Sequence, residues 1–254
     1  MSNPPHHRMI EAPRRTATQW DAWLRAWPVA PTRLCDLLSA QQRLVVVAPH
    51  PDDEVLACGA SLHDHAAEGG ECLVVGVTDG EASHANTPGH DPLELAQIRR
   101  LESTEGLQQL GVGFAHIVRL GLPDGDLAER TGELASRLAG LLRASDVVIS
   151  TWRKDGHPDH EACGHAAADA CAMQGATLLE APVWMWHWAV PGDSQVDWSR
   201  LRALAVEPTT VTRKLGALKA HQTQHTARPG GGTPVLDAAI LERAAWHTEY
   251  FFIP

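Results

Sequence analysis

One stretch, residues 45–62, constrains the fold of this chain more than any other. It begins with Val-Val-Val-Ala-Pro at residues 45–49, turns abruptly polar with His-Pro-Asp-Asp-Glu at residues 50–54, and then becomes apolar again at helical spacing. An uninterrupted β-branched run is typical of a strand that is buried on both faces of a parallel sheet. Active sites of open α/β sheets lie at the carboxyl ends of the strands, so the polar residues are expected at such a site.

A second strand-to-helix junction repeats this arrangement. Residues 147–150 (Val-Val-Ile-Ser) predict another buried strand, and the loop after it leads to His-Pro-Asp-His at residues 157–160. A helix is predicted over 159–173. If the two strands are neighbours, three or four potential metal ligands converge; the alternative interpretation is a pair of unrelated, solvated polar loops.

The first junction has the chemistry of a divalent metal site. His50 and Asp53 offer an imidazole nitrogen and a carboxylate oxygen, a combination that zinc accepts. Asp52 lies beside Asp53 in the sequence, so its carboxylate is expected to point another way. A carboxylate beside a metal-bound water can act as a general base, which makes Asp52 a candidate for that role.

Together the two junctions resemble the PIG-L / LmbE-like family of zinc-dependent N-deacetylases. The resemblance is ordered throughout and covers about residues 43–225. Its further elements are Thr78-Asp79-Gly80-Glu81, Arg99-Arg100-Leu101-Glu102, Leu122-Pro123-Asp124-Gly125 and Lys219-Ala220-His221-Gln222-Thr223-Gln224, the last with Thr223 where the family has Ser.

The resemblance implies a role for each residue of the two junctions. The metal ligands would be His50, Asp53 and His160, and three protein ligands leave an open position for water, as a catalytic zinc requires. Asp52 would be the general base. His157 would donate to the tetrahedral oxyanion or protonate the leaving amine.

Other roles follow less directly from the resemblance. Asp159 is expected to hydrogen-bond to His157 and keep it cationic. Arg99 corresponds to an arginine that some family members use on the substrate, although it could instead pair with a carboxylate on a helix surface. The expected substrate-binding residues are Arg99, Asp124, Trp152 and His221.

One departure from the family pattern affects the oxyanion. Some members carry a Tyr just before the second motif, whereas this chain has Asp155 in that neighbourhood, and its one Tyr is Tyr250. Trp152, Arg153 or the metal would then assist the oxyanion, or the substrate would differ.

The activity that the resemblance implies is hydrolysis of an N-acetyl or other N-acyl group on an amino sugar or a sugar-containing metabolite, with an N-acetylglucosaminyl group as the first expectation. Zinc-bound water, deprotonated by Asp52, would attack an amide carbonyl polarised by the metal, and iron(II) could replace zinc. The alternatives are a deacylase of a non-sugar amide and a non-catalytic protein that binds metal or ligand on the same fold. A metallo-phosphoesterase would need a two-metal cluster, for which the sequence supplies too few ligands.

The composition limits the kinds of partner and the cellular compartment that we expect for this protein. The net charge of −10 disfavours nucleic acid, which requires a basic surface, and no membrane span is expected. Five cysteines without paired metal spacing, and no export signal, favour free thiols in the cytoplasm. The expected partner is a small amino-sugar-type substrate, and a homo-oligomer is compatible with the sequence.

Repeated strand-helix units predict an α/β protein with a Rossmann-like, mostly parallel sheet and helices on both faces, together with an N-terminal helix and an irregular C-terminal part. Residues 1–16 are predicted to be a mobile tail, and residues 17–254 a single domain with its core at 43–225. The predicted strands are 43–48, 72–77, 114–120 and 146–150, and the helices between them are 54–68, 93–110 and 129–143.

Parallel strands joined by right-handed crossovers all end at one side of the sheet. His50, Asp79, Asp124 and His157 are therefore expected to converge on one rim. The long loop over residues 79–92 is expected at the same edge, where loops of that length are usually functional or mobile.

Two tryptophan-rich segments lie outside this core. Thr18 is predicted to open a helix, with Asp21 in a capping box and Trp20, Trp23 and Trp27 on one face. We expect this helix to pack on its own domain; the alternative is a dimer surface or a wall of the substrate cleft.

Residues 183–188 place Trp at every second position, which predicts a strand with three Trp on one face. This strand is expected to cover the core or the N-terminal helix, and a carbohydrate platform is the alternative. The rest of the C-terminal part is predicted as strand 201–207, helix 210–222, a flexible loop at 228–234, helix 236–246 and strand 250–252.

Overall fold

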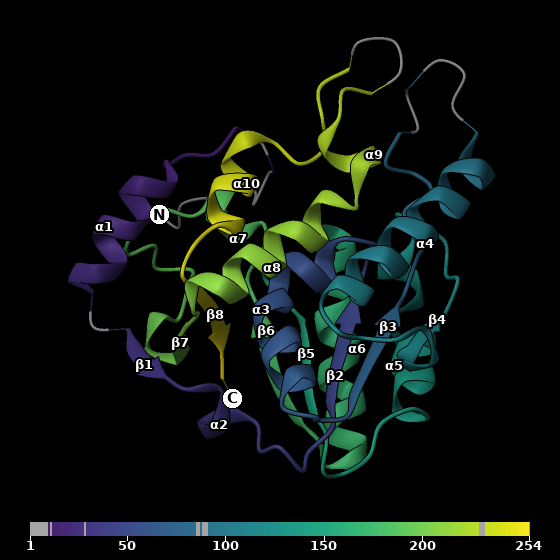
Figure 1. The fold of residues 1–254 in the computed structure, drawn as a ribbon, viewed down its shortest axis with the longest axis horizontal. Coiled ribbons are helices and arrows are strands. Elements are labelled where there is room, and N and C mark those ends of the chain that lie inside the picture. Colours follow the sequence, from purple (N-terminus) through teal and green to yellow (C-terminus); the bar gives the residue numbers. More distant parts are fainter. Residues whose placement is uncertain are drawn as a thin grey trace, which may run out of the picture.

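An eight-stranded mixed sheet runs through the described part of the chain (Figure 1). The computed structural model describes residues 10, 12–27, 29–84, 87, 91–228 and 232–253. The strands are β1 (Ala30–Thr32), β2 (Leu44–Ala48), β3 (Cys72–Gly76), β4 (Ile117–Arg119), β5 (Val147–Thr151), β6 (Thr177–Ala181), β7 (Leu201–Ala205) and β8 (Thr248–Phe252). Their order is β1-β7-β8-β6-β5-β2-β3-β4, and only the two pairings of β8 are antiparallel, which confirms the prediction of a mostly parallel sheet.

Helices cover both faces of this sheet, as predicted (Figure 1). They are α1 (Ala17–Ala26), α2 (Leu34–Leu37), α3 (Asp53–Ala67), α4 (Pro92–Gln109), α5 (Thr131–Ala139), α6 (Pro158–Gln174), α7 (Met185–Trp188), α8 (Pro208–Lys219), α9 (Gln222–His225) and α10 (Ala238–Ala244). Within the described residues, no helix combines the length and the apolar character that crossing a bilayer would require.

The position of β2 inside the sheet, with helices on both faces, explains why its sequence is apolar without interruption. All five of its residues are buried. Because successive side chains of a strand point to opposite faces, Val46 packs with α3, α4 and α8, whereas Val45 and Val47 pack with α5 and α6. β5 lies next to β2 in parallel register, with Leu44 opposite Val147, so the polar segments that follow the two strands emerge side by side.

The N-terminal helix α1 packs on the body of its own molecule. Its cap is Thr16 rather than Thr18, because the Thr16 hydroxyl accepts from the Gln19 N–H while the Gln19 side chain accepts from the Thr16 N–H. Trp20 is fully buried, and its indole N–H donates to the Trp186 carbonyl at 3.1 Å. The expectation that this helix covers its own domain is therefore confirmed.

The strand predicted over residues 183–188 is wrong, because this segment turns into the short helix α7. The Asp155 carboxylate accepts hydrogen bonds from the N–H groups of residues 183–185, which forms a helix start instead of a sheet ladder. Trp186 and Trp188 are buried in an aromatic cluster. They stabilise the core and do not form a carbohydrate platform.

The structure also differs from the prediction at the ends of some helices and strands and in several short elements. The strand predicted at 114–120 begins as a 3₁₀ turn, so β4 has three residues, and the helix predicted at 210–222 is divided into α8 and α9. The sequence did not predict β1, α2 or β6. The five cysteines are free, as predicted.

Three segments predicted as a mobile tail or as loops lie partly outside the described residues. These are residues 1–9 and 11 of the tail, residues 85–86 and 88–90 of the loop at 79–92, and residues 229–231 of the loop at 228–234. In the described part of the tail, the Arg14 N–H donates to the His187 carbonyl and its guanidinium to the Trp188 carbonyl, so α7 anchors this residue.

Candidate active site

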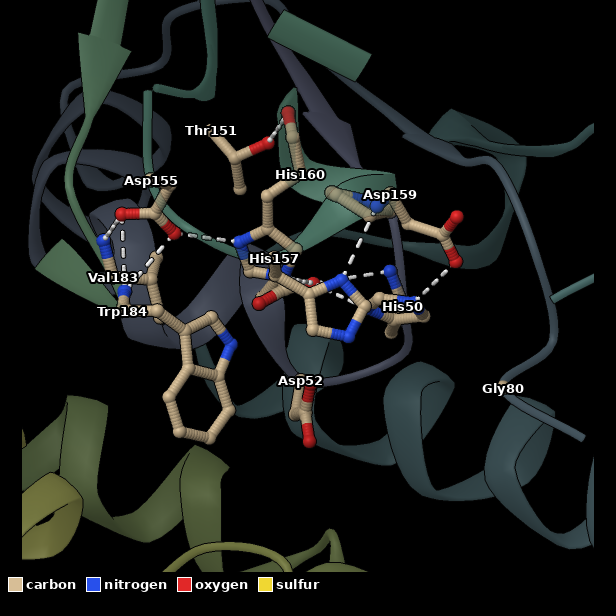
Figure 2. A network of polar contacts seen from close by, with 12 residues as sticks. His50, Asp52, Gly80, Thr151, Asp155, His157, Asp159, His160, Val183 and Trp184 are labelled. Carbon is tan, nitrogen blue, oxygen red and sulfur yellow. Dashed lines mark hydrogen bonds and ion pairs between the residues drawn. The ribbon is translucent and has the colours of Figure 1, made fainter. Parts of the chain in front are cut away.

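The two polar junctions form one buried cluster at the carboxyl ends of β2 and β5 (Figure 2). His50 and Asp53 come from the β2–α3 junction, and His160 comes from the first turn of α6. Asp53 Oδ2 lies 3.1 Å from His50 Nδ1 and 3.1 Å from His160 Nε2. The three predicted ligands thus offer one ligand atom each within 4.8 Å of one another.

Their geometry fits a small divalent cation. Ligand bonds of 2.0–2.1 Å in a tetrahedral site separate neighbouring ligand atoms by about 3.3 Å, close to the distances found here. His160 Nε2 is buried and, although Asp53 Oδ2 lies 3.1 Å away, it forms no hydrogen bond with any described residue. A buried nitrogen without a hydrogen bond is costly, and a metal ion would satisfy it.

The electrostatics of the cluster favour positive charge. Burial lowers the pKa of His160, but Asp53 and Asp155 outweigh it and raise that pKa to about 9. Burial also opposes ionisation of Asp53, yet His160 and His50 hold its pKa well below the usual range. A metal cation would interact with these carboxylates in the same favourable sense.

The backbone conformation at Asp52 keeps its carboxylate apart from that of the neighbouring Asp53. Asp52 is the one non-glycine among the described residues with a positive φ, 126°, which costs about 1–3 kcal/mol. Its N–H donates to the Glu54 carboxylate at 3.0 Å, which stabilises the turn. Figure 2 shows the Asp52 side chain apart from the carboxylates of Asp155 and Asp159, facing the imidazoles from another side.

Arg99 holds the loop that carries Asp52. It is buried, donates to the carbonyls of Gly80 at 2.8 Å and Pro51 at 2.7 Å, and lies 3.5 Å from Asp52 Oδ2. Burial raises the pKa of Asp52 to about 8 although Arg99 opposes this rise. Arg99 therefore pairs with a carboxylate, but at the wall of the site and not on a helix surface.

His157 and Asp159 are arranged differently from the prediction. His157 Nδ1 accepts from the backbone N–H of Asp159 at 3.2 Å, so its Nε2 carries the proton. Burial, with the charges of His160 and His50, lowers the pKa of His157 to about 3. The prediction that the Asp159 carboxylate keeps His157 cationic is wrong, because that carboxylate binds elsewhere.

The Asp159 carboxylate supports His50 instead. Asp159 Oδ2 and Asp124 Oδ1 each lie 3.1 Å from His50 Nε2. Burial opposes the charged form of His50, but its hydrogen bonds to these carboxylates raise its pKa well above the usual range. Carboxylates that hold one nitrogen of a histidine orient the other toward a metal, so Asp159 positions a predicted ligand.

Asp155 is a functional residue that the sequence reasoning missed. It is fully buried, and its Oδ2 accepts from His160 Nδ1 at 2.8 Å, which leaves Nε2 for a cation (Figure 2). The same carboxylate binds the N–H groups of residues 183–185. The sequence drew attention to Asp155, because it lies in the neighbourhood where some family members have Tyr, but its partners come from distant segments.

We expect Asp155→Asn to weaken metal affinity about 10–100-fold, the usual effect of removing a carboxylate behind a ligating histidine. Competition with a chelator would measure this affinity, and Asp169→Asn, at an exposed position of α6, is the matched control. A variant whose unfolding temperature falls while its metal affinity stays unchanged would show that Asp155 only stabilises α7.

A cavity of about 330 Å³ opens onto this cluster. Seven of the predicted residues line it: His50, Asp52, Asp53, Arg99, Asp124, His157 and His160. Gln224 also lines it, and Trp184, Val235 and Leu236 form an apolar side. The cavity therefore joins a polar floor, which contains the candidate metal ligands, to an apolar wall.

Two residues predicted to bind the substrate, Trp152 and His221, and one predicted at the rim, Asp79, do not line this cavity. Trp152 is buried and stacks on Phe252, with ring centroids 4.4 Å apart, so it belongs to the aromatic core. His221 is fully buried beside Gly106 of α4. Asp79 forms an ion pair with Arg100. None of the three lines the cavity, because packing within the domain occupies their side chains.

Comparison with known proteins agrees with this arrangement. The sequence profile of the PIG-L family, described as GlcNAc-PI de-N-acetylase, matches residues 45–171, which contain both junctions. The chain is 26% identical over 275 residues to 1D-myo-inositol 2-acetamido-2-deoxy-alpha-D-glucopyranoside deacetylase of Tsukamurella paurometabola, an alignment that covers 84% of this chain and 93% of the relative.

Two solved structures share the fold. A conserved protein of Thermus thermophilus is 26% identical and has a TM-score of 0.59 over 83% of this chain and 94% of its own. The N,N'-diacetylchitobiose deacetylase of Pyrococcus horikoshii is 21% identical and has a TM-score of 0.58 over 74% of this chain and 73% of its own. The profile match, which spans half of the chain, confirms the resemblance seen in the sequence: the protein belongs to the PIG-L family, whose LmbE-like deacetylases share its fold.

Proposed function

We propose that this protein is a zinc-dependent N-deacetylase that hydrolyses the N-acetyl group of an amino sugar or of a sugar-containing metabolite. The observation that supports this most is the convergence of His50, Asp53 and His160 in one cavity with a fourth residue, Asp52, whose carboxylate is not among the candidate ligands. A protein that only bound metal would need no such additional base. The family profile that matches the chain is described as a de-N-acetylase, and the Tsukamurella relative is named as a deacetylase.

The three ligands would hold one divalent cation, which supplies a Lewis acid for the amide carbonyl and lowers the pKa of a water molecule. Zinc suits the His-Asp-His donor set, and iron(II) is the alternative. Asp155, Asp159 and Asp124 fix the orientation of the two histidines before substrate enters.

The residues around the ligands have two different roles: Asp52 transfers the proton, and His157 stabilises the developing negative charge. Asp52 accepts the proton of the attacking water and passes it to the leaving amine nitrogen, while Arg99 holds its loop in place. His157 is neutral with its proton on Nε2, so it donates a hydrogen bond to the oxygen on which negative charge develops. The reaction yields acetate and a free amine.

The substrate proposal rests on the relatives and on the cavity wall. The Tsukamurella relative is named for a glucosaminide and the Pyrococcus enzyme for diacetylchitobiose, so we propose an N-acetylglucosaminyl group as the substrate moiety. Trp184, instead of the predicted Trp152, offers an apolar ring at the cavity. The five free cysteines support a reducing compartment, and we place the enzyme in the cytoplasm.

The experiment that tests this function is a screen of the zinc-loaded protein against N-acetyl amino sugars and small non-sugar acetamides, with release of free amine as the readout. We expect turnover on at least one N-acetylglucosaminide and its loss after chelation. Hydrolysis of non-sugar amides alone would contradict the sugar assignment, and no amine release from any compound would contradict the enzymatic function.

We expect Trp184→Ala to lower catalytic efficiency on an N-acetylglucosaminide about fivefold more than on a small acetamide, the equivalent of roughly 1 kcal/mol of lost aromatic contact. The backbone N–H of residue 184 would keep its bond to Asp155. Trp27→Ala, at an exposed tryptophan of the N-terminal region, is the control. An equal loss on both substrates would show that Trp184 does not contact the sugar.

A further inference from the structure

A second, smaller cavity of about 50 Å³ lies beside the catalytic one, behind α10. Leu56 lines both cavities, which makes them neighbours, but the predicted metal ligands do not line the small one. Its walls include three charged side chains: Lys214 from α8, Arg243 from α10 and Glu249 from β8. All three are at least nine-tenths buried. Figure 1 shows α8 and α10 close together on the face of the sheet that α3 covers.

Two of these charges neutralise each other. Lys214 Nζ lies 2.7 Å from Glu249 Oε1. The Glu249 carboxylate also accepts from the N–H groups of Ala60 and Ser61 and from the Ser61 hydroxyl, at 2.6–2.9 Å. The carboxylate is thus fully engaged at a break in α3, where Cys58 has non-helical backbone angles.

Arg243 has no such counter-charge. Its Nη2 donates to His187 Nδ1 at 2.7 Å, and burial lowers the pKa of that imidazole, so the partner is neutral. Arg243 Nη1 is buried without a hydrogen-bond partner, and in the described part of the chain no carboxylate lies within 4.0 Å of the guanidinium. The carboxylates of Asp237, Glu242 and Asp155 act on Arg243 only from a distance, and Asp237 lies beyond the imidazole ring, 3.3 Å from His187 Nε2.

The walls of the cavity therefore carry one positive charge in excess. Burial lowers the pKa of Arg243 to about 10, which leaves it protonated at neutral pH. A buried charge without a partner destabilises a protein, whereas an anion bound to a guanidinium gains charge-assisted hydrogen bonds. A monovalent anion would neutralise the cavity.

Its volume limits the size of this anion. A water molecule needs about 10–15 Å³ of such space, so the cavity holds roughly four water-sized groups, the size of acetate. We propose that this cavity is a binding site for one small carboxylate of acetate size, held by Arg243. The proposal does not depend on the deacetylase activity, although acetate would be a product of it.

The test compares acetate with gluconate, a carboxylate of the same charge that is too large for the cavity. Gluconate is replaced stepwise by acetate at constant ionic strength, and the unfolding temperature of the metal-loaded protein is measured. We expect the unfolding temperature of the wild type to rise saturably with acetate. The control Arg213→Gln, which removes an exposed cation of α8, should behave in the same way. Arg243→Gln should bind acetate at least tenfold more weakly. Acetate bound at the metal would act equally on all three proteins.

A second measurement follows acetate binding to wild-type protein and remains available if Arg243→Gln does not fold. Trp186 lines the small cavity and not the catalytic one. Its indole N–H signal in nitrogen-15 NMR, assigned with Trp186→Phe, should shift saturably with acetate and not with gluconate. No saturable shift, or an equal acetate response in wild type and Arg243→Gln, would overturn the proposal.

Discussion

Asp52→Asn is expected to keep the bound metal and to lose about 10²–10⁴-fold in kcat, the usual contribution of a general base. Asn is nearly isosteric with Asp but cannot accept the proton. The substitution should preserve the fold, because Asn tolerates the positive φ of residue 52 as well as Asp does. Asp52 is also absent from the group of three residues that would bind the ion, so metal content should not change.

Steady-state kinetics on the best substrate of the screen, together with elemental analysis, would measure both effects. Asp126→Asn makes the same chemical change at an exposed position outside the cavity and should leave kcat unaltered. An Asp52→Asn enzyme with near-normal kcat would remove this carboxylate from the mechanism. Loss of metal together with activity would instead show that Asp52 is a ligand.

His160→Ala is expected to reduce bound metal from about one equivalent to almost none after dialysis, and to abolish turnover with it, since two protein ligands replace three. His160 is fully buried, and its Nε2 forms no hydrogen bond with any described residue. The other imidazole nitrogen is fixed by Asp155 at 2.8 Å. The residue is therefore oriented for one contact.

Elemental analysis of dialysed protein gives the stoichiometry. His165→Ala removes an exposed imidazole from the same helix and should retain the metal. His160→Gln keeps more of the buried volume, so it separates loss of a ligand from loss of packing. Unchanged metal content in both His160 variants would refute the proposed ligand set.

The fold and the clustering of the candidate ligands could be predicted because their signals are local. The β-branched run of β2 specifies a doubly buried strand, and each His-containing motif follows directly on its strand. Once β2 and β5 are neighbours, the sheet brings His50, Asp53 and His160 together without further information. The resemblance to a known family named the same residues.

The parts that could not be predicted depend on contacts between distant segments. Asp155 accepts hydrogen bonds from the N–H groups of residues 183–185, and no periodicity in either segment reveals them. These hydrogen bonds are also the reason why the segment predicted as a strand forms α7. Trp152 follows β5 directly, yet Phe252, a hundred residues later, covers its ring. The carboxylate of Asp159 reaches His50 rather than its neighbour His157, because the β2–α3 turn lies within its reach.

The position of β8 has a consequence for the order in which the molecule assembles. β8 follows the other seven described strands in the sequence, yet it lies between β6 and β7 and pairs with both. As the chain leaves the ribosome, β2, β3, β5 and β6 can associate early, but β1 and β7 remain separate from them until residue 252 has emerged. During that interval two hydrogen-bonding edges are open at the middle of the future sheet, where a nascent chain is most exposed to pairing with another copy.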